Sequence, residues 1–267
     1  MSLFAKALAG PKKLILGHRG MGSTEPLEKP SAQKPYENTL KSLMMAARLA
    51  DGVEFDVMLS AGEELIVFHD ATTQRLFPDE LPTDIQTMSI TEIKALKGGP
   101  DIPTLREFFQ AISTLKHKPL LYMELKLSSI QAHNTTSNRE RLLTNAIAAL
   151  EEFGLEDQCM VVSFDFQILN MASELFPHAL IGYNCEFEFP KEVDFLSDCC
   201  AAVCPDVASL DQHFLAKAEA CHVKVLPFGE NLIIESALFD SVAGVTTDNI
   251  PEATVLVEKR SKHQSKL

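Results

Sequence analysis

Val53-Glu54-Phe55-Asp56-Val57 is the stretch around which the rest of this sequence can be placed. If it is a β-strand, Glu54 and Asp56 lie on one face and the three apolar side chains on the other. Two neighbouring carboxylates on a strand made for burial are costly unless a cation neutralises them. The stretch therefore predicts a buried strand that carries a cation-binding site.

Three further stretches place polar groups at the ends of apolar strands. They are Leu14-Ile15-Leu16-Gly17-His18-Arg19-Gly20, Phe68-His69-Asp70 and Tyr122-Met123-Glu124-Leu125-Lys126. With the first stretch they contribute two histidines, an arginine, a lysine and, within the strands themselves, the three carboxylates of Glu54, Asp56 and Glu124. This combination indicates a metal-assisted site for a phosphate ester.

The composition limits the class of protein. The chain has 267 residues, of which 46% are apolar, and a net charge of −13. So negative a chain is disfavoured as a nonspecific binder of nucleic acid or of anionic membranes. No apolar run approaches the roughly 18 residues of a membrane-spanning helix, and the first residues do not form a secretory signal. We expect no nucleic-acid partner and no stable membrane insertion.

Cysteine usage indicates a reducing compartment. The six cysteines, at 159, 185, 199, 200, 204 and 221, form no CxxC pair. They lie in or beside apolar runs, which favours buried free thiols over disulfides or a zinc site.

The order of predicted elements indicates an α/β fold. Eight strands are expected at 14–17, 53–59, 120–126, 159–164, 179–184, 201–204, 223–227 and 243–246. Helices are expected after them at 40–47, 105–112, 138–153, 166–175, 190–199, 211–220, 231–240 and 251–258. The run at 65–68 turns straight back after the second strand and predicts a hairpin, and 91–96 predicts a short helix.

This alternation predicts a single (β/α)₈ TIM barrel with a hairpin-containing insertion after strand two. A doubly wound open sheet is the alternative, but the chain has no G-x-G-x-x-G turn to support it. We expect one domain over residues 1–267, with the barrel at about 14–258 and a disordered tail at about 259–267.

In such a barrel the carboxyl ends of the strands meet at one face, where catalytic groups lie. Glu54, Asp56 and Glu124 are hard oxygen ligands, suited to Mg²⁺ or Ca²⁺. Buried ion pairs, Glu124 with Lys126 or Glu54 with Arg19, are the alternative, but neither explains all four groups together. Two histidines suit the acid–base cleavage of a P–O bond, and the basic side chains suit its phosphate.

The same residues resemble the motif series of the glycerophosphodiester phosphodiesterases. The series runs Gly17-His18-Arg19-Gly20, Glu37-Asn38-Thr39, Glu54-Phe55-Asp56-Val57, His69-Asp70 and Glu124-Leu125-Lys126. Val161-Val162-Ser163-Phe164 and Gly244-Val245-Thr246-Thr247-Asp248 extend the resemblance over about 14–252. Five short motifs in the right order are far more specific than any one of them alone.

The resemblance implies metal-dependent hydrolysis of glycerophosphodiesters, such as glycerophosphocholine or glycerophosphoethanolamine, to glycerol 3-phosphate and an alcohol. It implies roles for seven residues: Glu54, Asp56 and Glu124 hold Mg²⁺ or Ca²⁺, His18 and His69 form the acid–base pair, and Arg19 and Lys126 bind the phosphate. Glu37 is expected near His18 or the metal, and Asn38-Thr39 as a helix cap. Acid and base stay unassigned, and the nucleophile is water or the substrate's neighbouring hydroxyl.

The chain departs from the family pattern beside the site. Tyr36 replaces the usual proline before Glu-Asn-Thr, and Pro227-Phe228-Gly229-Glu230-Asn231 stands where many members carry Trp-Thr-Val-Asn. Phe228 is expected to supply the apolar wall. Phospholipase D-like activity on lysophospholipids or sphingolipids is a second hypothesis; it predicts an apolar surface at the site mouth. A non-catalytic ligand-binding barrel is a third, and it predicts a missing core group, whereas none is missing.

The last three residues bear on location. Ser265-Lys266-Leu267 matches the address that a peroxisomal import receptor reads, and it follows a polar, positively charged segment. We expect a cytoplasmic protein, with import into peroxisomes through this tripeptide as the alternative.

Overall fold

A ring of parallel strands carries the motifs of this chain. The structure is a computed structural model and describes residues 1–26, 28–62, 64–78, 80–96, 101–128 and 131–264. The parallel strands are β1 Leu14–Gly17, β2 Gly52–Leu59, β4 Leu120–Leu125, β5 Cys159–Ser163, β6 Leu180–Cys185, β7 Cys200–Pro205, β8 Lys224–Val225, β9 Phe228–Gly229 and β10 Gly244–Thr247. Their buried residues form near-continuous apolar runs, as expected where both faces of a parallel sheet are covered.

The sheet closes through a single interrupted strand. Strands β8 and β9 are two ends of the stretch 224–229, which Leu226 and Pro227 separate. β8 pairs with β7, and β9 pairs with β10. Proline has no amide hydrogen for the ladder, which accounts for the interruption. The TIM-barrel-like fold is therefore confirmed, and the open sheet is wrong.

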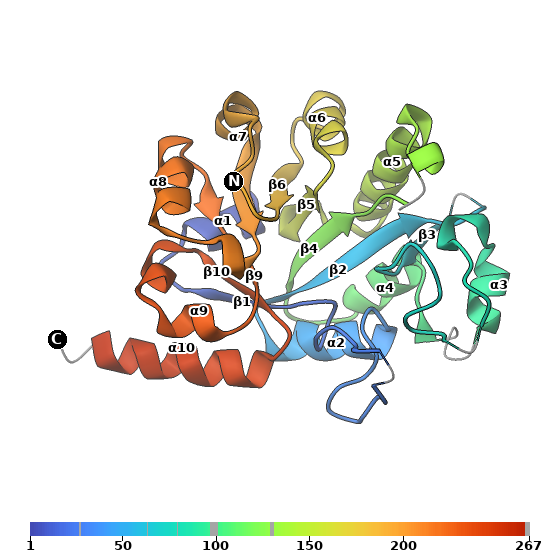
Figure 1. Cartoon of the computed structure of the whole chain (residues 1–267), viewed down its shortest axis with the longest axis horizontal. Helices are drawn as coiled ribbons and strands as arrows, with labels where there is room; N and C mark the ends of the chain where they lie inside the picture. Colours follow the sequence, from blue (N-terminus) through green and yellow to red (C-terminus); the bar gives the residue numbers. More distant parts are fainter. Residues whose placement is uncertain (27, 63, 79, 97–100, 129–130, 265–267) are drawn as a thin grey trace.

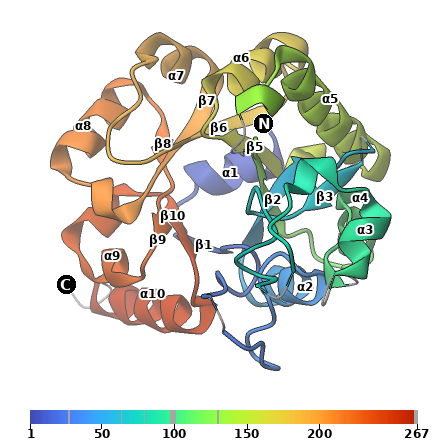
Figure 2. The ribbon, with the colours of Figure 1, turned by 45° about the vertical axis from the view of Figure 1, so that its right-hand side comes forward.

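Helices surround the ring of strands (Figures 1 and 2). They are α2 Leu40–Leu49, α4 Leu105–Ile112, α5 Thr136–Phe153, α6 Phe166–Leu175, α7 Val193–Cys199, α8 Gln212–Ala220, α9 Leu232–Glu235 and α10 Ile250–Gln264. The main core fills the space between strands and helices; Phe55, for example, packs edge-on against Phe108 at 4.8 Å. The predicted helix at 231–240 is wrong as one element, because Ser236 is extended and separates α9 from a 3₁₀-helix at Ala237–Ser241.

A short N-terminal helix that the sequence pattern did not indicate covers the barrel interior. Helix α1, Leu3–Ala9, lies in the middle of the ring in Figure 2. Its Phe4 and Leu8 are buried in one cluster with inward-facing strand residues such as Leu16 and Tyr122. This apolar cluster fills the interior, so the polar groups of the barrel gather at the carboxyl ends of the strands.

The insertion after β2 forms a unit with its own small core. Strand β3, Leu65–Val67, pairs antiparallel with β2, which confirms the predicted hairpin. Helix α3, Ile90–Ala95, follows, and Phe68, Ile85 and Ile93 are among the buried residues of this unit. Because the chain leaves β3 next to the carboxyl end of β2, the insertion brings His69 to the barrel mouth.

The expected disorder from Lys259 is wrong for residues 259–264, where α10 continues as a helix. Arg260 anchors this end: Nη2 lies 2.7 Å from Oδ2 of Asp240, and Nη1 donates to the carbonyl oxygen of Ile234 at 3.1 Å. Ser265-Lys266-Leu267 lies outside the described residues. Among the helices of the described ranges, none has the length and apolar character needed to cross a membrane.

The six cysteines are free, as predicted. Four of them, at 159, 185, 204 and 221, are buried, and the other two are partly buried. Burial raises the pKa of the thiols of Cys185 and Cys200 to about 12, so both stay protonated and unreactive at neutral pH.

Candidate active site

Three carboxylates meet at the carboxyl ends of two neighbouring strands. Glu54 and Asp56 lie on β2, and Glu124 lies on β4, where it pairs in register with Asp56. All three are buried, and one oxygen from each lies within 4.8 Å of the others. The structure thus brings together the cation-binding set that the sequence predicts.

One oxygen of each carboxylate is fixed by an N–H donor. The backbone N–H of Arg19 donates to Oε2 of Glu54 at 2.6 Å. The carboxamides do the same for the other two: Nδ2 of Asn38 lies 2.7 Å from Asp56, and Nδ2 of Asn184 lies 3.0 Å from Glu124. These contacts set the direction in which each remaining oxygen points.

The carboxylate set fits a hard divalent cation. Oε1 of Glu54 is buried and has no hydrogen-bond partner in the described part of the chain. Burial, together with the neighbouring charges of Asp56 and Glu124, raises the pKa of Glu54 well above its ordinary value. An orphaned buried oxygen beside two further carboxylates is the environment that Mg²⁺ or Ca²⁺ would relieve.

Two left-handed residues aim these donors. Arg19 has φ 48° and Asn38 has φ 55°, and the backbone N–H of Asn38 donates to the carbonyl oxygen of Arg19 at 2.9 Å. Non-glycine residues with such angles cost energy and persist where their surroundings fix them. Thr39 alone caps α2, accepting from the N–H of Ser42. The cap expected at Asn38 or Thr39 is therefore Thr39, while the carboxamide of Asn38 holds Asp56.

Two cationic side chains flank the carboxylates. Nζ of Lys126 lies 2.9 Å from Glu124 and 3.5 Å from Asp56, and Nε of Arg19 lies 3.6 Å from Asp56. Burial would lower the pKa of Lys126, but Glu124 and Asp56 raise it above its ordinary value. The same competition acts on Asp56: burial would raise the pKa of its carboxyl, but the charges of His69, Lys126 and Arg19 lower it. The predicted Glu124–Lys126 pair is thus present within the larger cluster.

His18 enters the site from the end of β1. Its Nδ1 lies 2.7 Å from Oδ1 of Asp248, directly after β10, and its Nε2 faces Oε2 of Glu54 at 3.9 Å. Ser23 fixes the aspartate through its backbone N–H at 2.7 Å and its hydroxyl at 2.9 Å. Burial would raise the pKa of Asp248, but the contacts with His18 and Ser23 lower it.

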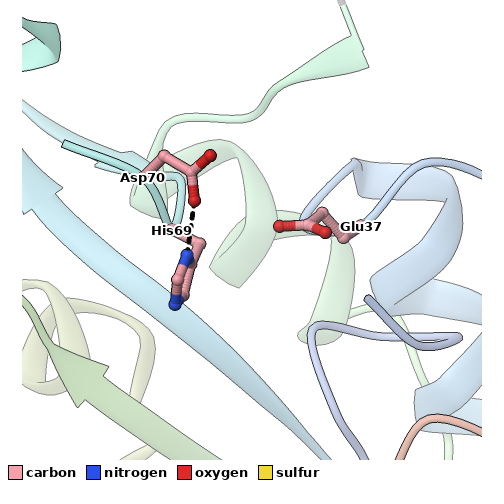
Figure 3. A group of neighbouring side chains, drawn as sticks. All are labelled: Glu37, His69 and Asp70. Atoms are coloured by element: carbon pink, nitrogen blue, oxygen red, sulfur yellow. Dashed lines mark hydrogen bonds and ion pairs between the residues drawn. The ribbon is translucent and has the colours of Figure 1, made fainter. Parts of the chain in front are cut away.

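His69 enters the site from the insertion, whereas His18 comes from the barrel itself. Its Nδ1 lies 2.6 Å from Oδ1 of the adjacent Asp70 (Figure 3). Figure 3 also shows the carboxylate of Glu37, from the segment before α2, facing this pair. Glu37 is expected near His18 or the cation; the structure brings its carboxylate within 4.8 Å of ligand atoms of His69 and Asp70.

Arg75 joins the two carboxylates of Figure 3. Its Nε donates to Oδ2 of Asp70 at 2.6 Å, and its Nη1 donates to Oε2 of Glu37 at 2.9 Å. Glu37, whose side chain is fully buried, also accepts from Nη1 of Arg19 at 3.0 Å. Burial would raise the pKa of Glu37, but hydrogen bonds from Arg75 and the charges of both arginines lower it.

Sequence reasoning missed Asn38, Arg75, Asn184 and Asp248 as parts of the site. Asp248 lies in a motif that the resemblance already includes, and Arg75 lies six residues after His69, so both offered a signal. Asn184 offered none, because its place beside Glu124 depends on the sheet order.

Two aromatic side chains, from β9 and from the residue after β5, form an apolar wall at the site. Phe228 of β9 packs edge-on against Phe164, which follows β5, with ring centroids 6.1 Å apart. Nζ of Lys126 lies 5.9 Å from the centroid of Phe164, so the wall adjoins the cationic groups. Phe228 therefore lies where an apolar wall is expected.

Comparison with known proteins gives a consistent result. The model of the glycerophosphoryl diester phosphodiesterase family matches residues 18–252, which include all the site motifs. A glycerophosphodiester phosphodiesterase of Caldanaerobacter subterraneus is 30% identical over 186 residues, which is 65% of this chain and 68% of that protein.

Solved structures share the fold over nearly the whole chain. A structure from Silicibacter pomeroyi has a TM-score of 0.81 at 19% identity and covers 97% of this chain and 98% of that one. A phosphodiesterase of Oleispira antarctica, solved with its product sn-glycerol-3-phosphate, has a TM-score of 0.76 at 23% identity, with 94% and 99% covered.

Proposed function

We propose that this chain, which belongs to the glycerophosphoryl diester phosphodiesterase family and is a phosphoric diester hydrolase, cleaves deacylated phospholipid headgroups. Glycerophosphocholine and glycerophosphoethanolamine are examples of such substrates. The products are glycerol 3-phosphate and the free alcohol. One observation carries the proposal: two histidines, each oriented by a carboxylate through Nδ1, stand beside a buried trio of acidic ligands.

The histidines divide the proton transfers between them. Because Asp248 and Asp70 engage the Nδ1 atoms, the Nε2 atoms of His18 and His69 remain for the substrate. One imidazole takes the proton of the attacking hydroxyl, and the other gives a proton to the leaving alkoxide. The attacking group is water or the neighbouring glycerol hydroxyl; the second route passes through a cyclic phosphate.

The buried acidic and basic groups bind the phosphate jointly. Glu54, Asp56 and Glu124 would hold Mg²⁺ or Ca²⁺. Such a cation neutralises charge on the phosphate and polarises its oxygens. Arg19 and Lys126 bind the non-bridging oxygens, and their fixed positions beside the carboxylates orient the diester before cleavage.

A direct assay tests this proposal. The purified protein is incubated with glycerophosphocholine, glycerophosphoethanolamine and lysophosphatidylcholine in the presence of Mg²⁺ or Ca²⁺, and glycerol 3-phosphate and free alcohol are measured. Release of both products from the first two substrates is expected, and the matched variant Glu54→Gln should release neither. Absence of glycerol 3-phosphate with either metal would overturn the proposal.

Phospholipase D-like activity on lysophospholipids is the second candidate. The observation in its favour is the aromatic wall, since Phe164 is 40% exposed and contacts Phe228. An acyl chain could lie against these rings. Leu27, the large aliphatic residue of the loop at 21–36, lies outside the described residues. Faster release of choline from lysophosphatidylcholine than from glycerophosphocholine would favour this candidate.

A further inference from the structure

A cavity of about 690 Å³ opens beside His69, on the side of the insertion. His69 and Lys126 line it, so it is continuous with the candidate active site. Much of the remaining lining comes from the insertion segment directly after His69, including Asp70, Thr72 and Gln74. The insertion therefore contributes a surface for substrate as well as a histidine.

The position of this cavity fits one arm of a phosphodiester. A phosphate bound by Lys126 with its leaving-group oxygen toward His69 makes that imidazole the acid of the reaction. The group attached to this oxygen then extends past His69, into the space that the insertion lines.

The charged groups that line the cavity do not suit a cationic headgroup. Asp70 is the carboxylate among them, and both of its oxygens accept from Arg75, while one also bonds His69. Arg75 and Lys126, the cations of this lining, are likewise paired, Arg75 with Asp70 and Glu37 and Lys126 with Glu124 and Asp56. The described lining residues include no Phe, Tyr or Trp, the rings that form a cage for a quaternary ammonium group.

Two neutral hydrogen-bonding side chains remain for a ligand. Gln74 is exposed and Thr72 is partly exposed, and neither engages its side chain in a hydrogen bond within the described residues. An amide offers both a donor and an acceptor, and a hydroxyl offers the same. Alcohols with several hydroxyl groups can satisfy both side chains, whereas a trimethylammonium group can satisfy neither.

We propose that this cavity is the headgroup site and that Thr72 and Gln74 select uncharged polyol headgroups, such as glycerol or inositol, over quaternary ammonium headgroups. The inference rests on the proposed function and specifies its substrate class. One hydrogen bond in such a site changes affinity by about three- to tenfold. Two such bonds predict a preference of tenfold or more.

The test compares kcat/KM for glycerophosphoglycerol, glycerophosphoinositol and glycerophosphocholine with Mg²⁺ present. The natural protein should prefer the two polyol substrates by about tenfold or more. Gln74→Leu and Thr72→Val should each lower kcat/KM for the polyol substrates about three- to tenfold and leave glycerophosphocholine within about twofold. Gln110→Leu, on the exposed face of α4, is the matched control and should change nothing.

The outcomes separate this inference from the function beneath it. If none of the three substrates is cleaved, the proposed function fails. If all three are cleaved and glycerophosphocholine is preferred, the function stands and the headgroup site is overturned. The same conclusion follows if both variants lower kcat/KM equally for all three substrates. Melting temperatures of the variants near that of the natural protein show that a loss is local.

Discussion

The two histidines of this site have nearly the same immediate contact and different support behind it. His18 lies 2.7 Å from Asp248, and His69 lies 2.6 Å from Asp70. Behind Asp248 stand the neutral donors of Ser23, whereas behind Asp70 stands a guanidinium. The barrel supplies the first pair from β1 and the residue after β10, and the insertion supplies the second.

The difference shows how an insertion can be tied to a barrel site. Arg75 binds Asp70 within the insertion and Glu37 from the segment before α2. Glu37 in turn binds Arg19 from the end of β1. The position of His69 therefore depends on a chain of charge-assisted contacts, while that of His18 depends on neighbouring strands held in register.

Removal of the cation should silence both halves of the site together, because the three carboxylates lie between them. Activity should vanish in excess EDTA and return with Mg²⁺ or Ca²⁺. The melting temperature should rise when the metal is added, since the cation relieves repulsion among buried carboxylates. Unchanged hydrolysis after prolonged chelation would contradict the cation site.

Loss of either imidazole should lower activity nearly as much as removal of the cation does. The loss should be about equal for His18 and for His69. His18→Ala and His69→Ala should each lower kcat by about 10²–10⁴-fold, the usual contribution of acid–base catalysis. Binding of the metal, read from the rise in melting temperature, should be nearly kept, whereas Asp56→Ala should lose both. Near-normal turnover in one histidine variant would show that the pairs are not equivalent.

Substitution of the residues that support the two histidines should lower the free energy of unfolding by different amounts on the His69 and His18 sides. Arg75→Gln leaves the buried carboxylate of Glu37 short of a partner, so it should lower the free energy of unfolding by about 3 kcal/mol. Ser23→Ala removes one neutral hydroxyl contact and should cost about 1 kcal/mol. Urea denaturation measures both, and equal losses would mean that the charged link carries no extra stability.

The smallest expected effect is a change in pH dependence. Contacts with Arg75 lower the pKa of Glu37, and contacts with His69 and then Arg75 lower the pKa of Asp70, despite the burial of both groups. A carboxyl whose folded pKa lies below its unfolded value of about 4 stabilises the fold above that pH, and this stability is lost as the pH falls through the folded pKa. Arg75→Gln should therefore lose less stability than the natural protein when the pH falls below about 4. Melting curves from pH 6 to pH 2.5 test this, with Ser23→Ala as the control.

Local patterns were enough to predict much of the fold. The alternation of Glu54 and Asp56 with apolar neighbours, the short turn before β3 and the regular succession of strands and helices are all short-range signals. The prediction of one helix at 231–240 was wrong because one extended residue, Ser236, interrupts a run of suitable composition. The prediction of disorder at the end of α10 was wrong because these residues are mostly polar. Their sequence does not show that Asp240 lies close enough to pair with Arg260.

The sequence by itself determined which groups we propose for the chemistry, since carboxylates, imidazoles and basic side chains at strand ends are local features. The tertiary structure alone decided which groups support them. Asp248 reaches His18 across 230 positions, and Asn184 reaches Glu124 across 60, because all the parallel strands of a closed barrel end at one face. Hydrogen bonds act over about 3 Å in space, whatever the separation along the chain.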